Sequence, residues 1–213
     1  LLSPHFIYRV ELPPEANAQV PTPLGDHQLA TRLSYFVWSS MPDEQLFTHA
    51  DNGSLSDPMV LNGEIERMLQ DPRSKALVDN FAGQWLQVRG MDDVAPDHDF
   101  FPDFDESLRA SMKLETLLFF QRFLSSNLPV QDMINAPFTF LNSRLANHYD
   151  LDHQTGEERE DLPSGFKEVE LNGTDRAGLM TMGSVLTVTS YPNRTSPVKR
   201  GKWILEQLMC DAP

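Results

Sequence analysis

A long helix with an apolar middle is the feature that most constrains how this chain can fold. The sequence predicts a helix over 106–126, begun by Asp105 as its N-cap and ended by Leu128-Pro129. Its middle, Leu117 to Phe120, reads Leu-Leu-Phe-Phe and is apolar on every side. Such a helix is stable in water only when other elements cover it. We therefore expect this helix to lie at the centre of a domain.

Shorter helices are predicted on both sides of it along the chain. Asp26 is interpreted as the N-cap of the first helix, and Asp57 precedes another that has Pro58 at its first position. Further helices are predicted at 43–50, 72–89, 130–135, 141–149, 175–187 and 197–209, and a short strand within 166–171. We predict a mainly α fold, namely a multi-helix bundle with a smaller C-terminal helical subdomain and at most a short β element.

Two stretches without apolar periodicity divide the chain. Residues 12–26 contain four prolines, so 1–24 are predicted to be the tail of an upstream domain and a Pro-rich connector. A polar, acidic stretch at 150–173 separates a predicted helical bundle domain, 25–155, from a C-terminal helical subdomain, 156–213. Because the chain starts with Leu1 and has no signal-peptide pattern, we interpret it as a piece of a longer or processed protein.

The charge and the cysteine content exclude several classes of function. Thirty-one acidic against seventeen basic residues give a net charge of -14, which disfavours nucleic-acid binding. No apolar run approaches the roughly 20 residues that a membrane-spanning helix needs. One cysteine, Cys210, allows neither an internal disulfide nor the CxxCH pattern that attaches c-type haem. We therefore expect no nucleic-acid partner, no membrane span and no haem in these residues.

A dense group of carboxylates precedes the central helix, between Asp92 and Glu106. Oxygen ligands of this kind suit Ca²⁺, and Asp97, Asp99 and Asp103 are the candidate ligands. The EF-hand pattern is not met, because Pro102 stands where glycine is needed and Leu108 where glutamate is needed. The alternative interpretation is a solvated loop whose last acidic residues cap the helix.

Glu115 is the candidate catalytic residue, although no catalytic motif accompanies it. It precedes the apolar stretch of the long helix, where burial would raise its pKa and suit acid-base chemistry. The alternative is an ordinary buried ion pair with Arg122 or Arg109. The sequence contains no GxSxG, Walker, GxGxxG or HExxH pattern, which favours a non-catalytic role.

Basic residues gather near the end of the chain. Ser196 is predicted to cap the last helix, and Arg194, Lys199 and Arg200 lie beside it. Together they form a candidate anion-binding site that would suit a carboxylate, a phosphate or a haem propionate. The alternative is that Lys199 and Arg200 pair with acidic residues of neighbouring helices.

Several stretches resemble one known family. They include ATRLSYFVWSSMPDEQL, DPRSKALVDNFAGQWL, FPDFDESLRASMKLETLLFF and, most specifically, TSPVKRGKW. These resemble adjoining domains of unknown function in large exported proteins of planctomycetes and related bacteria, often called planctomycete cytochrome-type proteins. The resemblance covers nearly the whole chain.

The resemblance implies an exported protein, periplasmic or extracellular, whose other domains are the partners of this one and can include a c-type haem domain outside these residues. It assigns no catalytic residues. We therefore expect a non-catalytic scaffold or docking module of a multidomain protein. The alternatives are an enzyme that degrades extracellular carbohydrate with acidic residues, and an adhesion module stabilised by Ca²⁺.

Overall fold

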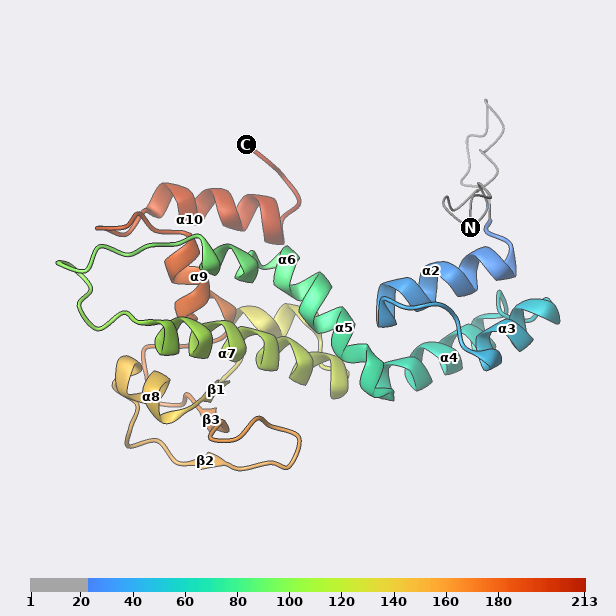
Figure 1. Cartoon of the computed structure of the whole chain (residues 1–213), viewed down its shortest axis with the longest axis horizontal. Coiled ribbons are helices and arrows are strands. Elements are labelled where there is room, and N and C mark those ends of the chain that lie inside the picture. Colours follow the sequence, from blue (N-terminus) through green and yellow to red (C-terminus); the bar gives the residue numbers. More distant parts are fainter. Residues whose placement is uncertain (1–22) are drawn as a thin grey trace. The chain divides into compact units, whose positions relative to one another are not determined.

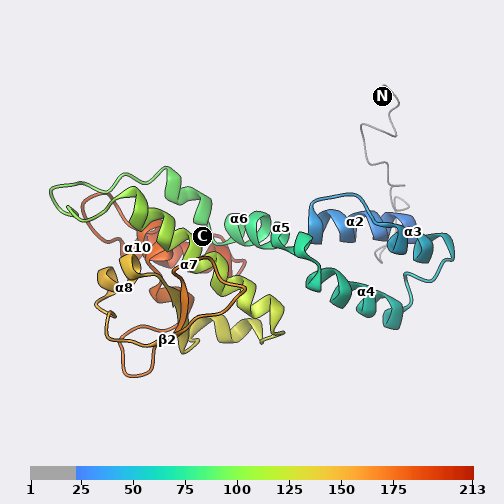
Figure 2. The same ribbon diagram turned by 60° about the horizontal axis from the view of Figure 1, so that its bottom comes forward.

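The computed structural model describes residues 23–213, which fold into two compact units, shown in Figures 1 and 2. Unit 1 runs to Ser74 and unit 2 from Lys75 to Pro213. Helices predominate in both units, and a small antiparallel sheet lies in unit 2, so the predicted fold class is confirmed. The predicted tail and connector, 1–24, lie almost entirely outside the described residues.

In the described part of unit 1, residues 23–74, three helices and a short helical turn surround a small core. The elements are α2 (Asp26–Trp38), α3 (Glu44–Asp51), α4 (Pro58–Gln70) and a 3₁₀ turn (Pro72–Ser74). Asp43 and Asp57 cap α3 and α4 through their side chains. The prediction that Asp26 caps α2 is wrong, because Gly25 holds that position. The Asp26 carboxylate instead accepts a hydrogen bond from the distant Leu55 N–H at 2.8 Å.

A partly buried charge network joins α3 to α4 in unit 1. The Arg67 guanidinium lies 2.6 Å from Glu64 and 2.9 Å from Asp43, and Gln45 donates a hydrogen bond to Glu64 at 2.5 Å. The Glu64 side chain is only 4% exposed. Its charge is therefore matched by a cation inside the unit, which is the condition under which a buried carboxylate is tolerated.

Unit 2 is built around α7, the helix that the sequence predicts to be central. Its helices are α5 (Lys75–Leu77), α6 (Gly83–Trp85), α7 (Glu106–Ser125), α8 (Ser143–Tyr149), α9 (Gly183–Val188) and α10 (Pro197–Trp203). π-helical turns at Val78–Ala82 and Ile204–Leu208 follow α5 and α10, and 3₁₀ turns lie at Val88–Asp92, Val130–Ile134 and Leu179–Thr181. Asp105 caps α7 by accepting the Leu108 N–H, as predicted.

Three short strands complete unit 2, in the order β1-β3-β2. They are β1 (Phe138–Leu141), β2 (Gly156–Glu157) and β3 (Lys167–Glu170), and β3 pairs antiparallel with both neighbours. The predicted strand within 166–171 is β3. Figure 1 shows α7 passing between this sheet and α9, and both contact it.

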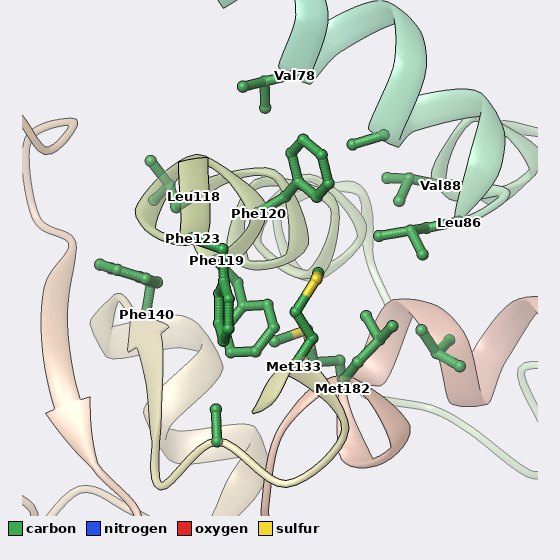
Figure 3. Packing of buried hydrophobic residues seen from close by; sticks show 14 of the residues in the cluster. Val78, Leu86, Val88, Leu118, Phe119, Phe120, Phe123, Met133, Phe140 and Met182 are labelled. Atoms are coloured by element: carbon green, nitrogen blue, oxygen red, sulfur yellow. The ribbon is translucent and has the colours of Figure 1, made fainter. Parts of the chain in front are cut away.

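The aromatic side chains of α7 form the centre of the larger core (Figure 3). Phe119 is fully buried and lies against Phe123 and Phe138, with ring centroids 5.0 and 5.4 Å apart. Phe120 faces the α5–α6 segment and meets Trp85 edge-on at 6.2 Å. Because the helix is apolar on several sides, the sheet and the surrounding helices can cover it together, as the sequence predicts.

Two predicted helices differ from the structure. The helix expected over 72–89 is divided into α5, a π-helical turn and α6, and it ends at Trp85. A helix was expected over 175–187, but α9 starts only at Gly183. Residues before it are held by side chains instead, since Thr181 Oγ1 accepts the Ala177 N–H at 3.0 Å and Thr174 Oγ1 accepts the Arg176 N–H at 3.2 Å. Such local bonds compete with helix formation. Among residues 23–213, no helix has the length and apolar character needed to cross a membrane.

Candidate functional site

A pocket of about 460 Å³ opens on unit 2 between the acidic loop, residues 93–105, and the turn before α10, residues 189–196. Met112 of α7, His148 of α8 and Leu186 of α9 contribute to its lining. The remaining lining residues come from the loop, the turn and the two neighbouring helices: Val94, Pro96, Phe100, Phe101, Pro102, Asp103, Phe104, Thr187, Ser190, Tyr191, Arg194, Thr195 and Arg200. A volume of this size is within the range of pockets that hold small organic molecules.

One backbone hydrogen bond joins the two walls of the pocket, and others close each wall. The Asp97 N–H donates to the Pro192 carbonyl at 2.9 Å, and the Asp97 carbonyl accepts the N–H groups of Phe100 and Phe101. The turn is closed by the pair of Tyr191 and Arg194, whose backbones form an isolated bridge. Loop and turn project at the same end of unit 2 in Figures 1 and 2. The pocket therefore has two connected walls.

Arg109 anchors the acidic loop and does not form the predicted ion pair with Glu115. Its guanidinium donates to the carbonyls of Met91 and Val94, and its side chain pairs with Glu106 at 3.1 Å. It also lies 5.1 Å from the ring centre of Phe104, which lines the pocket. Arg109 thus fixes the shape of one wall.

Arg194, Lys199 and Arg200 have no carboxylate partners among residues 23–213. Arg200 donates to the hydroxyls of Thr195 at 3.2 Å and Thr189 at 3.5 Å. Lys199 donates to the Ser190 carbonyl at 3.0 Å and lies 4.4 Å from the ring centre of Tyr191. Arg194 contacts the same ring at 5.2 Å. The alternative that Lys199 and Arg200 pair with acidic neighbours is therefore wrong for the described part of the chain.

Most other cations of unit 2 do form such pairs, which makes the contrast informative. The paired residues are Lys75, Arg109, Lys113, Arg122, Arg144, Arg159, Lys167 and Lys202. Carboxylates are abundant in this chain, whose net charge is -14. A cation that pairs with none of them can interact with a bound anion instead.

The predicted anion-binding residues are only partly gathered at this pocket. Arg194 and Arg200 line it, whereas Ser196 and Lys199 do not. Ser196 is buried and accepts the Lys199 N–H at 3.2 Å, so it caps α10 as predicted. We therefore assign the candidate site to the two arginines and the pocket rather than to the start of the helix.

The three predicted metal ligands are not brought together in the same way. Asp103 lines the pocket, and Asp97 accepts the Asp99 N–H at 3.0 Å. In the part of the chain that the structure describes, no three His, Cys, Asp or Glu side chains lie close enough together to hold a metal ion. Calcium binding at Asp97, Asp99 and Asp103 stays a prediction.

Glu115 is buried inside unit 2, away from solvent. Its residue is 1% exposed, and its two carboxylate oxygens accept hydrogen bonds from Thr139 at 2.6 Å and Tyr149 at 2.7 Å. The Tyr149 hydroxyl also accepts the Gly183 N–H at 2.6 Å. The proposed ion pair with Arg122 or Arg109 is wrong, because Arg122 pairs with Glu168 of β3 at 3.2 Å.

Burial dominates the acidity of this group. Because desolvation disfavours the charged form, the pKa of Glu115 rises to about 7 from an ordinary 4.5, although the hydrogen bonds from Thr139 and Tyr149 act in the opposite direction. Arg176 lies 3.5 Å from the ring centre of Tyr149 and also lowers the Glu115 pKa. The predicted rise in pKa is present, but Glu115 does not line the pocket.

His148 is a titratable group of the lining whose place at this pocket was not predicted from the sequence. Desolvation, and then the charges of Arg176 and Arg144, lower the pKa of His148 below 6.5. It is therefore neutral at pH 7, and the charges of the lining are those of Asp103, Arg194 and Arg200.

The aromatic wall was also missed by the sequence reasoning. Phe100, Phe101 and Tyr191 all line the pocket and remain partly exposed, at 61%, 45% and 43%. The available signal was the pair of adjacent phenylalanines in an acidic loop, where large apolar side chains are unusual.

Comparison with known proteins gives a family but no function. Residues 24–151 match the model of PSD4, a protein family of unknown function (DUF1592), and residues 176–213 match that of PSCyt3, also of unknown function (DUF1588). No curated protein and no solved structure matches the chain at a significant level. The two family names denote planctomycete cytochrome-type domains, as the resemblance predicts. Because the first model covers more than half of the sequence, this chain belongs to the PSD4 family.

Proposed function

We propose that this chain is a non-catalytic binding module of a larger protein, and that its binding site is the pocket between the acidic loop and the turn before α10. One observation carries the proposal. Two arginines, Arg194 and Arg200, line an apolar pocket without a carboxylate partner among residues 23–213. The ligand is accordingly an organic anion with an apolar part.

The physical environment strengthens the attraction between these arginines and an anion. Aromatic and aliphatic side chains surround the cations, so a bound ligand displaces water from the pocket. Charges interact more strongly where water is excluded. Guanidinium groups also form paired hydrogen bonds with carboxylate and phosphate oxygens.

The positions of the carboxylates favour binding over acid-base catalysis. Glycoside hydrolysis uses two carboxyl groups roughly 5 to 10 Å apart across a cleft. Of the acidic residues in the described chain, Asp103 alone lines the pocket, and Glu115 is buried elsewhere. A carbohydrate-degrading activity has no such pair to use at this site.

The family names suggest the setting of the module. We infer an exported protein in which this chain docks against other domains, one of which carries c-type haem outside these residues. The sole cysteine, Cys210, cannot supply the two thiols that c-type attachment needs. An absorption spectrum of the natively purified full-length protein without haem bands would remove the haem-bearing domain from this proposal.

A fluorescent amphipathic anion tests the binding role directly. Anilinonaphthalenesulfonate should increase in fluorescence on binding to the chain, because it moves from water into an apolar site. Replacing Ser190, which lines the pocket, by tryptophan should fill the cavity and remove most of this signal. The exposed Met59 of unit 1 gives a matched control, since Met59→Trp leaves the pocket unchanged. Equal signals from both variants would refute the assignment of the pocket.

A further inference from the structure

We propose that the pocket selects a small organic ligand with a single carboxylate on a flat, apolar body, and discriminates against phosphate dianions. This inference rests on the proposed function and specifies the ligand class of the same site. It is argued from three properties of the lining: the orientation of the cations, the exposed aromatic wall and the charge balance.

The cations are held by contacts that leave them available. Arg200 is oriented by two threonine hydroxyls, Thr195 and Thr189, rather than by a carboxylate. Arg194 lies beside the Tyr191 ring, 5.2 Å from its centre. A guanidinium oriented by neutral groups retains its full charge and can offer N–H groups to a ligand oxygen pair.

The aromatic wall requires an apolar body on the ligand. Phe100 and Phe101 belong to the loop, and Tyr191 belongs to the turn. All three are more than two-fifths exposed, so an apolar ligand would cover surface that now contacts water. Met112 and Leu186 add an apolar lining from α7 and α9. A flat ring system offers the largest contact with such walls.

The charge balance sets the preferred charge of the ligand. Two arginines and one aspartate, Asp103, line the pocket, while His148 is neutral at pH 7 for the reasons given above. The lining therefore carries a net charge that one anionic group neutralises. A second negative charge would meet Asp103 without a further cation of the lining. A carboxylate fits this balance better than a phosphate dianion.

Three ligands with one ring system separate these contributions. Binding of naphthoate, naphthamide and naphthyl phosphate should be measured by titration calorimetry at pH 8, where the phosphate is a dianion. We expect naphthoate to bind about 10-fold more tightly than naphthamide, because the neutral amide cannot form charged hydrogen bonds with the arginines. Naphthyl phosphate should bind more weakly than naphthoate.

Variants of the lining test which residues determine the preference. Arg194→Gln and Arg200→Gln should each weaken naphthoate binding about 10-fold. Lys202→Gln is the control, because it removes one positive charge from α10, the helix of Arg200. Lys202 pairs with Glu206 and does not line the pocket, so the affinity for naphthoate should change by no more than about 2-fold. Asp103→Asn should increase the affinity for naphthyl phosphate more than that for naphthoate.

The outcomes distinguish this inference from the proposed function. If the amide or the phosphate binds as tightly as naphthoate, and Ser190→Trp still abolishes binding, the ligand class is wrong and the binding module stands. If none of the three ligands binds, or if Ser190→Trp leaves their affinities unchanged, the pocket is not the site and both proposals fail. Melting temperatures of all variants establish that each one remains folded.

Discussion

Among residues 23–213, each unit of this protein buries one glutamate, and the two are stabilised in opposite ways. Glu64 in unit 1 lies 2.6 Å from the Arg67 guanidinium, which also contacts Asp43. Glu115 in unit 2 accepts hydrogen bonds from the neutral hydroxyls of Thr139 and Tyr149. Both residues are at most 3% exposed.

The two sites shift the pKa of their carboxyl groups in opposite directions. In unit 1, desolvation, which raises the pKa of Asp43, is outweighed by hydrogen bonds from Arg67 and the Leu46 N–H, so the pKa of Asp43 falls. In unit 2, desolvation prevails and raises the pKa of Glu115 to about 7. The Arg67 guanidinium therefore lowers the pKa of the partly exposed Asp43, whereas burial beside neutral hydroxyls leaves Glu115 titrating near neutrality.

The largest expected effect is the loss of the cation in unit 1. Arg67→Met should destabilise unit 1 by about 4 kcal/mol, because it leaves Glu64 buried without its cation. Hydrogen exchange of the buried amides of α2 and α4 measures this change within the unit. Asp51→Asn, which breaks an exposed pair with His27 in the same unit, is the control and should cost under about 1 kcal/mol. Equal losses in both variants would contradict the role assigned to burial.

Replacing Glu115 by a neutral residue should stabilise the protein at alkaline pH, whereas Arg67→Met destabilises it. The folded pKa of about 7 exceeds the ordinary value of 4.5, so the folded state binds the proton more tightly. The stability from protonated Glu115 is fully present below pH 4.5 and is lost as the pH rises through 7. Glu115→Gln should therefore be more stable than the natural chain by about 3 kcal/mol at pH 8, relative to their difference at pH 4.5.

Denaturant unfolding across this pH range measures that difference between the two proteins. Glu64→Gln gives the matched comparison. It removes the carboxylate that pairs with Arg67 and should therefore destabilise the chain. A constant difference between Glu115→Gln and the natural chain at all pH values would mean that Glu115 does not titrate in this range.

Removing one hydroxyl donor should have the smallest effect of the three. Tyr149→Phe deletes a bond to Glu115 and leaves the Gly183 N–H without its acceptor, which should cost about 2 kcal/mol. The cost should be larger at pH 8 than at pH 5, since the charged carboxylate needs the donor more. Tyr35→Phe, at an exposed tyrosine, should change little. A loss independent of pH would show that packing alone is affected.

The sequence predicted the elements that depend on local signals. Asp105 and Ser196 cap α7 and α10, and the apolar stretch at 117–120 lies in the larger core, as expected from caps and periodicity. The strand β1 was not predicted, because Phe138–Leu141 contains four residues and its pairing partner is the distant β3. Pairing between distant strands has no local signature.

The candidate site was predicted less completely, for the same reason. Helical spacing placed Arg122 beside Glu115, but Arg122 instead meets Glu168 on β3. The acidic loop and the basic turn were recognised as separate features, and only the fold joins Asp97 to Pro192. The predicted domains, 25–155 and 156–213, follow the same sequence features as the two family matches, 24–151 and 176–213, and their limits stay a prediction.

The larger core of unit 2 has a consequence for how such genes can be rearranged. Met182 and Val185 of the second family-matched segment pack with Phe119 and Phe140 of the first, so residues from both segments fill the larger core. A recombination event between 151 and 176 would divide this core, whereas one near Ser74 would fall between compact units. Residues 75–213 should therefore be inherited as one block, with the helices before Ser74 free to be exchanged separately.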